Sequence, residues 1–160
     1  MIEATVEAPS AALRVLLIED SQDDAEIVVA ELRGSMQRPL VIERVASETQ
    51  LLAALDASFW DAVLCDYRLP SFDALNALTI LKRRALDLPF IIVSGTLGER
   101  EAVCAMRAGA HDFFSKDNRT RLPAAIEREL REVAVRRDRE KLQEQLLLSD
   151  RLNSIGTLAA

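Results

Sequence analysis

Five short runs of mostly apolar residues recur between residues 14 and 116, and longer amphipathic stretches separate them. The runs are RVLLIE, PLVIERV, WDAVLCD, PFIIVSG and AHDFFSK. A strand that is apolar throughout, rather than at every second residue, is typical of a parallel sheet with helices on both faces. The pattern predicts an α/β fold, a (βα)5 doubly wound parallel sheet, over residues 13–122.

Helix signals occupy the intervals between these runs. Ser21 precedes an acidic first turn, as a helix N-cap does, and two four-residue segments fit capping boxes. These are SETQ, which begins at Ser47, and TLGE, which begins at Thr96 and ends at Glu99. Gly109 follows the helix candidate EREAVCAMRA at the position of a left-handed C-cap. The helix signals therefore agree with alternating strands and helices.

Size and composition indicate a soluble, cytoplasmic protein. The 160 residues suffice for one domain and an appendage, and residues 1–12 show no periodicity, so we expect a disordered leader. No apolar run approaches the roughly 20 residues of a membrane span. Residues 119–160 have a net charge of only +2 within a chain of net charge −6, which argues against a nucleic-acid partner.

The two cysteines and the single histidine are poor candidates for a site. Cys65 lies inside an apolar run, and neither it nor Cys104 belongs to a CxxC or Cys/His pattern, so inert thiols are expected. His111, the only histidine, is expected in a loop or at the start of a strand. The sequence therefore predicts no disulfide and no histidine-based metal site.

Polar residues follow four of the five runs. Glu19 and Asp20 come after the first, Asp66 after the third, Ser94 after the fourth and Lys116 after the fifth. Groups that follow parallel strands meet at one edge of the sheet. Three carboxylates there favour a hard cation such as Mg²⁺. Together with this ion, the Lys116 ammonium and the Ser94 hydroxyl suit the binding of a phosphoryl group.

A single residue of this kind has a plainer explanation. An aspartate after a strand is more often a turn residue than a nucleophile, and a lone serine or lysine says even less. All four positions, however, have the residue types that acyl phosphate formation on Asp66 requires. The combination favours phosphoryl chemistry over turn formation.

The chain resembles the receiver domain of two-component response regulators in four segments: VLLIEDSQDD, DAVLCDYRLPSFDAL, PFIIVSGT and AMRAGAHDFFSKDN. The resemblance implies a flavodoxin-like receiver in which Asp66 accepts a phosphoryl group from a phosphohistidine. It also implies a Mg²⁺ site formed by Asp66, Glu19, Asp20 and the backbone carbonyl of Arg68.

The same resemblance implies roles for three further residues. Ser94 and Lys116 match the positions that bind the phosphoryl oxygens, and Phe113 matches the aromatic switch position, although core packing would also explain a phenylalanine there. Asp117 follows Lys116 where the family usually has proline. Because a cis bond is costly before any other residue, the direction of the Lys116 side chain stays open.

A long helix is predicted after the domain. Residues 123–155 contain strong helix formers and no internal glycine, with Pro123 in the first turn. Apolar residues at 126, 130 and 133, and again at 148, 152, 155 and 159, form two patches separated by RRDREK. We expect a projecting coiled coil that pairs two copies through residues 123–160; a lone solvated helix is the alternative.

The last residues, SDRLNSIGTLAA, are similar to the start of the dimerisation helix of sensor histidine kinases. This similarity implies an N-terminal fragment of a hybrid histidine kinase, cut before its phosphoacceptor histidine and ATP-binding domain, so whether this piece is an enzyme stays open. A stand-alone response regulator acting by protein contact is the alternative.

Two other classes fit less well. A haloacid-dehalogenase-like phosphatase needs an acid two residues after its nucleophile, where this chain has Arg68. A flavodoxin-like cofactor binder needs a phosphate-binding first loop, and the acidic segment EDSQDD would repel a phosphate.

Overall fold

A five-stranded parallel sheet forms the centre of the molecule. The computed structural model describes residues 11–96 and 98–158, so most of the predicted leader lies outside the described residues. The strand order is β2-β1-β3-β4-β5. The strands are β1 (Leu13–Ile18), β2 (Leu40–Val45), β3 (Ala62–Cys65), β4 (Phe90–Ser94) and β5 (Asp112–Ser115). The predicted (βα)5 parallel sheet is confirmed.

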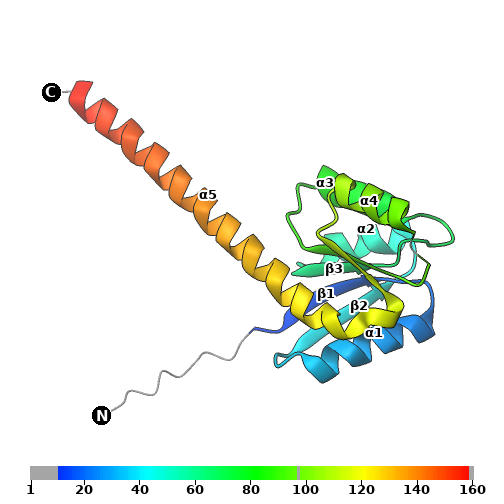
Figure 1. Ribbon diagram of the computed structural model, residues 1–160. Coiled ribbons are helices and arrows are strands. Elements are labelled where there is room, and N and C mark those ends of the chain that lie inside the picture. Colours follow the sequence, from blue (N-terminus) through cyan, green and yellow to red (C-terminus); the bar gives the residue numbers. More distant parts are fainter. Residues whose placement is uncertain (1–10, 97, 159–160) are drawn as a thin grey trace, which may run out of the picture.

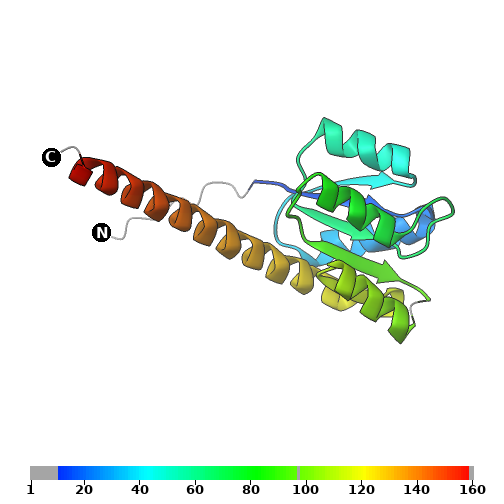
Figure 2. The same cartoon turned by 90° about the horizontal axis from the view of Figure 1, so that it is seen from above.

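Helices cover both faces of this sheet (Figures 1 and 2). They are α1 (Gln22–Ser35), α2 (Glu48–Ala57), α3 (Ala74–Arg83), α4 (Glu99–Ala108) and α5 (Leu122–Leu158), with a 3₁₀ segment, η1 (Lys116–Arg121), before α5. Alternate strand residues supply two separate cores. Leu16 and Ile18 pack toward α2, α3 and α4, whereas Val15 and Leu17 pack toward α1 and the start of α5. Burial on both sides explains the continuous apolar runs of β1, β3 and β4, whereas the edge strands β2 and β5 expose half of their residues.

Local capping follows the sequence signals at three of four sites. The Ser21 hydroxyl accepts a hydrogen bond from the Asp24 N–H at 3.3 Å, and the Ser47 hydroxyl accepts one from the Gln50 N–H at 3.2 Å. Gly109 ends α4 with φ of 110°, a left-handed conformation that suits glycine.

The capping box predicted at Thr96 and Glu99 is wrong. Helix α4 begins at Glu99, and its N-cap is Gly98. Glu99 is therefore the first residue of the helix and cannot reach back as the third residue of a box does. Glu101 has that role instead, because its Oε2 accepts a hydrogen bond from the Gly98 N–H at 2.9 Å.

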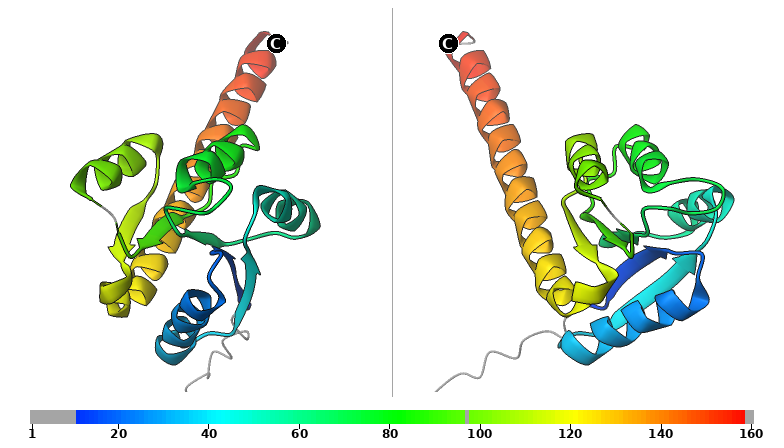
Figure 3. Two further views of the ribbon diagram at one scale, coloured as in Figure 1. Left: turned by 90° about the vertical axis from the view of Figure 1, so that its right-hand side faces the viewer. Right: turned by 45° about the vertical axis from the view of Figure 1, so that its right-hand side comes forward.

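Helix α5 has 37 residues, about 55 Å at the usual rise, and extends far beyond the sheet (Figure 3). Its first turns belong to the core, since Leu122 and Ile126 are fully buried. The first of the two predicted apolar patches thus packs on the sheet. The second patch is exposed at Leu148, Leu152 and Ile155, together with Leu142, Leu146 and Leu147.

Candidate functional site

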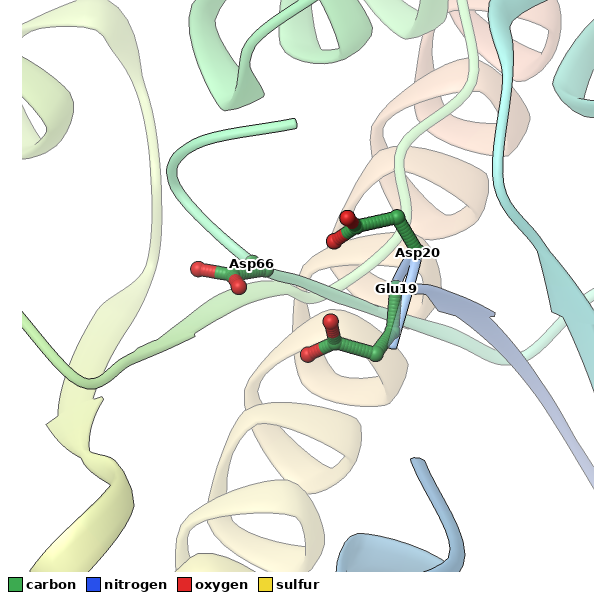
Figure 4. Close-up of side chains that lie close together, drawn as sticks. All are labelled: Glu19, Asp20 and Asp66. Carbon is green, nitrogen blue, oxygen red and sulfur yellow. The ribbon is translucent and has the colours of Figure 1, made fainter. Parts of the chain in front are cut away.

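Three carboxylates meet at the carboxyl ends of the two central strands. Glu19 and Asp20 follow β1, Asp66 follows β3, and these strands pair side by side. Each residue offers a carboxylate oxygen, and these oxygens lie within 4.8 Å of one another. Figure 4 shows the three side chains facing a common space. The predicted meeting of Glu19, Asp20 and Asp66 is confirmed.

Glu19 is the buried member of this cluster, with 3% of its surface exposed. Burial raises the pKa of its carboxyl above the usual value, although hydrogen bonds from Lys116 and from the Ser21 N–H act in the opposite direction. Asp66 is partly buried and Asp20 is exposed. The cluster therefore opens to solvent beside Asp20 and Asp66, where a small ion or a phosphodonor has access.

Lys116 supplies the positive charge of the site. Its Nζ lies 3.1 Å from Asp66 Oδ2, 3.0 Å from Glu19 Oε2 and 2.6 Å from Asp24 Oδ2. Burial alone would lower the pKa of the ammonium, but the bonds to Asp24, Glu19 and Asp66 outweigh it and raise the pKa. Lys116 therefore stays charged throughout the physiological pH range.

Replacing the usual proline with Asp117 does not turn Lys116 away from the site. No peptide bond is cis in the part of the chain that the structure describes. The Asp117 N–H donates to the Ser115 hydroxyl at 3.3 Å, which caps η1 at its first residues. The direction of Lys116, open from the sequence, is thus resolved toward Asp66.

Ser94 and Phe113 lie where the sequence places them. Ser94 is the last residue of β4, is 3% exposed, and pairs in register with Ser115, the residue before Lys116. Phe113 lies on β5 with an exposed side chain. Only the placement of these two residues is established, and their roles at a phosphoryl group stay predictions.

The side chain of Arg68 points to helix α4. Its guanidinium binds the Glu101 carboxylate, which also caps that helix through Gly98. An arginine held in this way cannot serve as the second acid of a dehalogenase-like phosphatase. The metal-binding role of its backbone carbonyl stays a prediction.

The sequence prediction missed two residues of the site. Asp24 binds Lys116, and Arg44, near the end of β2, donates through Nη1 to the Glu19 carbonyl oxygen at 3.0 Å. The predicted topology could have placed both residues near the site, because Asp24 lies in the first helical turn after the end of β1 and Arg44 lies on the strand next to β1.

The donor set is made of oxygen ligands only, which is the set that Mg²⁺ prefers. An ammonium beside a partly exposed carboxylate can bind an oxyanion while that carboxylate attacks it. The arrangement suits phosphoryl transfer to Asp66.

Comparison with known proteins agrees with this chemistry. Residues 15–127 match the response regulator receiver domain. The chain belongs to this family. The receiver is 37% identical over 112 residues to the C4-dicarboxylate transport transcriptional regulatory protein DctD of Rhizobium meliloti, covering 67% of this chain and 23% of DctD. An NtrX-like response regulator of Rickettsia felis is 29% identical over 147 residues, covering 90% of this chain and 30% of that protein.

Solved structures show the same fold. NtrX from Brucella abortus superposes with a TM-score of 0.72 at 27% identity, covering 82% of this chain and 29% of NtrX. The signal receiver domain of a LuxO repressor protein from Vibrio parahaemolyticus gives 0.70 at 23% identity, covering 78% and 95% of the two chains. The flavodoxin-like receiver fold is confirmed.

The receiver chain spans less than a third of the curated relatives named here, which are regulators and not histidine kinases. These relatives agree with the stand-alone alternative and do not support the predicted kinase fusion. Among residues 11–96 and 98–158, no helix combines the length and apolar character that a membrane crossing requires.

Proposed function

We propose that this receiver accepts a phosphoryl group on Asp66 from a phosphohistidine of a partner protein. An oxygen of the Asp66 carboxylate attacks the phosphorus, the P–N bond to the imidazole breaks, and its electron pair stays on that nitrogen. The product is an acyl phosphate. The observation that supports this most directly is the contact of Asp66 Oδ2 with Lys116 Nζ at 3.1 Å beside two further carboxylates.

The residues around Asp66 have complementary tasks in this proposal. Mg²⁺ held by Glu19, Asp20, Asp66 and the Arg68 carbonyl would supply positive charge for the phosphoryl oxygens. Lys116 binds one phosphoryl oxygen, and the Ser94 hydroxyl donates to another. Phe113, exposed on β5, reports the change to the surface as the aromatic switch.

Mass spectrometry of the intact protein tests the proposal. With acetyl phosphate and Mg²⁺, the wild type should gain about 80 Da, one phosphoryl group, and the gain should disappear without Mg²⁺. Asp66→Asn should gain nothing. Asp23→Asn, an exposed carboxylate in the first turn of α1, is the matched control and should behave as the wild type does. Labelling that persists in Asp66→Asn would refute the assignment of the acceptor.

For the output we propose pairing of two copies through the exposed leucines of α5. Leu148, Leu152 and Ile155 follow the spacing of a coiled-coil seam and are exposed in the single chain. Sedimentation equilibrium should show a dimer that Leu152→Lys weakens. A monomer at all accessible concentrations would leave the lone solvated helix as the correct description.

Two outputs are compatible with such a helix. The likeness of SDRLNSIGTLAA to a kinase dimerisation helix favours fusion to a histidine kinase, whereas the named relatives favour a response regulator. The coding sequence around residue 160 distinguishes them. Continuation into a phosphoacceptor histidine and an ATP-binding domain supports the kinase, and a stop codon or another output domain supports the regulator.

A further inference from the structure

Three carboxylates lie within ion-pair distance of the Lys116 ammonium. Glu19 and Asp66 belong to the three-carboxylate cluster, and the third partner, Asp24, does not. Asp24 nevertheless makes the shortest contact, 2.6 Å, against 3.0 Å and 3.1 Å for the other two. The ammonium donates hydrogen bonds to Asp24 and Asp66 and forms an ion pair with Glu19, so a phosphoryl oxygen must compete with these carboxylates for its three N–H groups.

The backbone of Asp24 is held in place by a contact that does not involve its carboxylate. Its backbone N–H donates to the Ser21 hydroxyl at the start of α1. Its side chain is 39% exposed, whereas that of Lys116 is 14% exposed. The Asp24 carboxylate therefore lies at the solvent edge, where water can replace the ammonium as its hydrogen-bond partner.

We propose that Asp24 is a positioning residue that restrains Lys116 in the resting site and slows the formation of the acyl phosphate. The inference rests on the proposed function of Asp66. A phosphoryl oxygen that binds Lys116 must compete with these carboxylate contacts. Asp24 is neither the nucleophile nor a member of the three-carboxylate cluster. Its contact with Lys116 therefore serves neither the attack nor the metal site, and it only competes with the phosphoryl oxygen for the ammonium.

The kinetic test compares matched variants with acetyl phosphate and saturating Mg²⁺. Asp24→Asn, which keeps the shape of the side chain, should be phosphorylated about three- to tenfold faster than the wild type, the range expected for one partly exposed ion pair. Asp23→Asn removes the same charge from the same helical turn and should change the rate less than about twofold.

A second pair of variants, made in Lys116→Gln, tests whether Asp24 affects the phosphorylation rate through Lys116 or through its charge alone. In Lys116→Gln, the Asp24→Asn change should leave the rate unaltered, because no ammonium remains to be restrained. If the acceleration persists in that background, Asp24 acts on the phosphodonor directly and the inference is wrong.

A metal-free readout tests the contact itself. Bonded lysine ammonium groups exchange slowly and give a ¹⁵N–¹H signal in NMR spectra. The Lys116 signal should shift or broaden in Asp24→Asn and stay unchanged in Asp23→Asn. An unchanged signal in both variants would overturn the inference.

The failure of the two proposals can be told apart. If the wild type gains no phosphoryl group from any donor, the proposed function fails and the inference fails with it. If the wild type is phosphorylated and Asp24→Asn reacts no faster than Asp23→Asn, only the inference fails.

Discussion

Two isoleucines of the same helix should respond very differently to truncation. Ile126 is fully buried among Leu122, Ala125 and the sheet, whereas Ile155 is 63% exposed. Ile126→Ala removes buried carbon atoms and leaves a cavity, which costs about 2–5 kcal/mol. At about 2–4 °C per kcal/mol for a domain of this size, a central loss of about 3 kcal/mol lowers Tm by roughly 6–12 °C. Ile155→Ala should change the unfolding free energy of the monomer by less than about 0.5 kcal/mol.

Urea unfolding followed by tryptophan fluorescence measures the unfolding free energy of both variants. Trp60 is the single tryptophan and is buried, so its emission reports global unfolding. Similar losses for both variants at low protein concentration would refute the division of α5 into a core part and a projecting part. A loss at Ile155 that grows with protein concentration would instead show that the distal helix is covered in a self-associated form.

Three further perturbations address the charges and thiols. Lys116→Met should tighten Mg²⁺ binding by about tenfold in calorimetry, because the ammonium that competes for Glu19 and Asp66 is gone; weaker binding would contradict this competition. An aromatic disulfide reagent should modify one thiol in the native protein, the exposed Cys104. Cys65 should react slowly, because burial and then the charge of Asp66 raise the pKa of its thiol, and a second fast-reacting thiol at pH 8–9 would contradict the structure. Asp87→Ala should cost less than about 1 kcal/mol, since its pair with Arg136 is about half exposed, but should speed amide exchange in the surrounding turn; unchanged exchange would show that this contact does not hold the helix.

Hydrophobic pattern alone sufficed for the architecture. Three of the apolar runs correspond to strands that are buried on both faces, β1, β3 and β4, and every residue of β3 and β4 is buried. The edge strands β2 and β5 expose half of their residues, so their runs are less strictly apolar. The start of α4 was not predictable in the same way. Whether Thr96 or Gly98 precedes the first helical turn depends on the path of the loop, and both are followed three residues later by glutamate.

Some residues of the site were predictable from the sequence and others were not. Residues that directly follow a strand were predictable, because the topology alone places Asp66 and Lys116 at one edge. The contact of Lys116 with Asp24 joins residues 92 positions apart and depends on the length and direction of one flexible side chain. The carbonyl contacts of Arg44 are of the same kind. Long side chains that bridge separate elements carry no periodic signal in the sequence.

The position of Lys116 gives α5 a short connection to the site. Lys116 is the first residue of η1, and the six residues of that segment lead directly to Leu122, which is fixed in the core. Farther along, Arg136 binds both oxygens of the Asp87 carboxylate. A helix held at two points cannot unfold at its start without losing core packing, so we expect any change at Lys116 to reach the exposed leucines as a rigid shift of α5. We therefore propose that the receiver ends within α5, after the Asp87 contact, and not at residue 122.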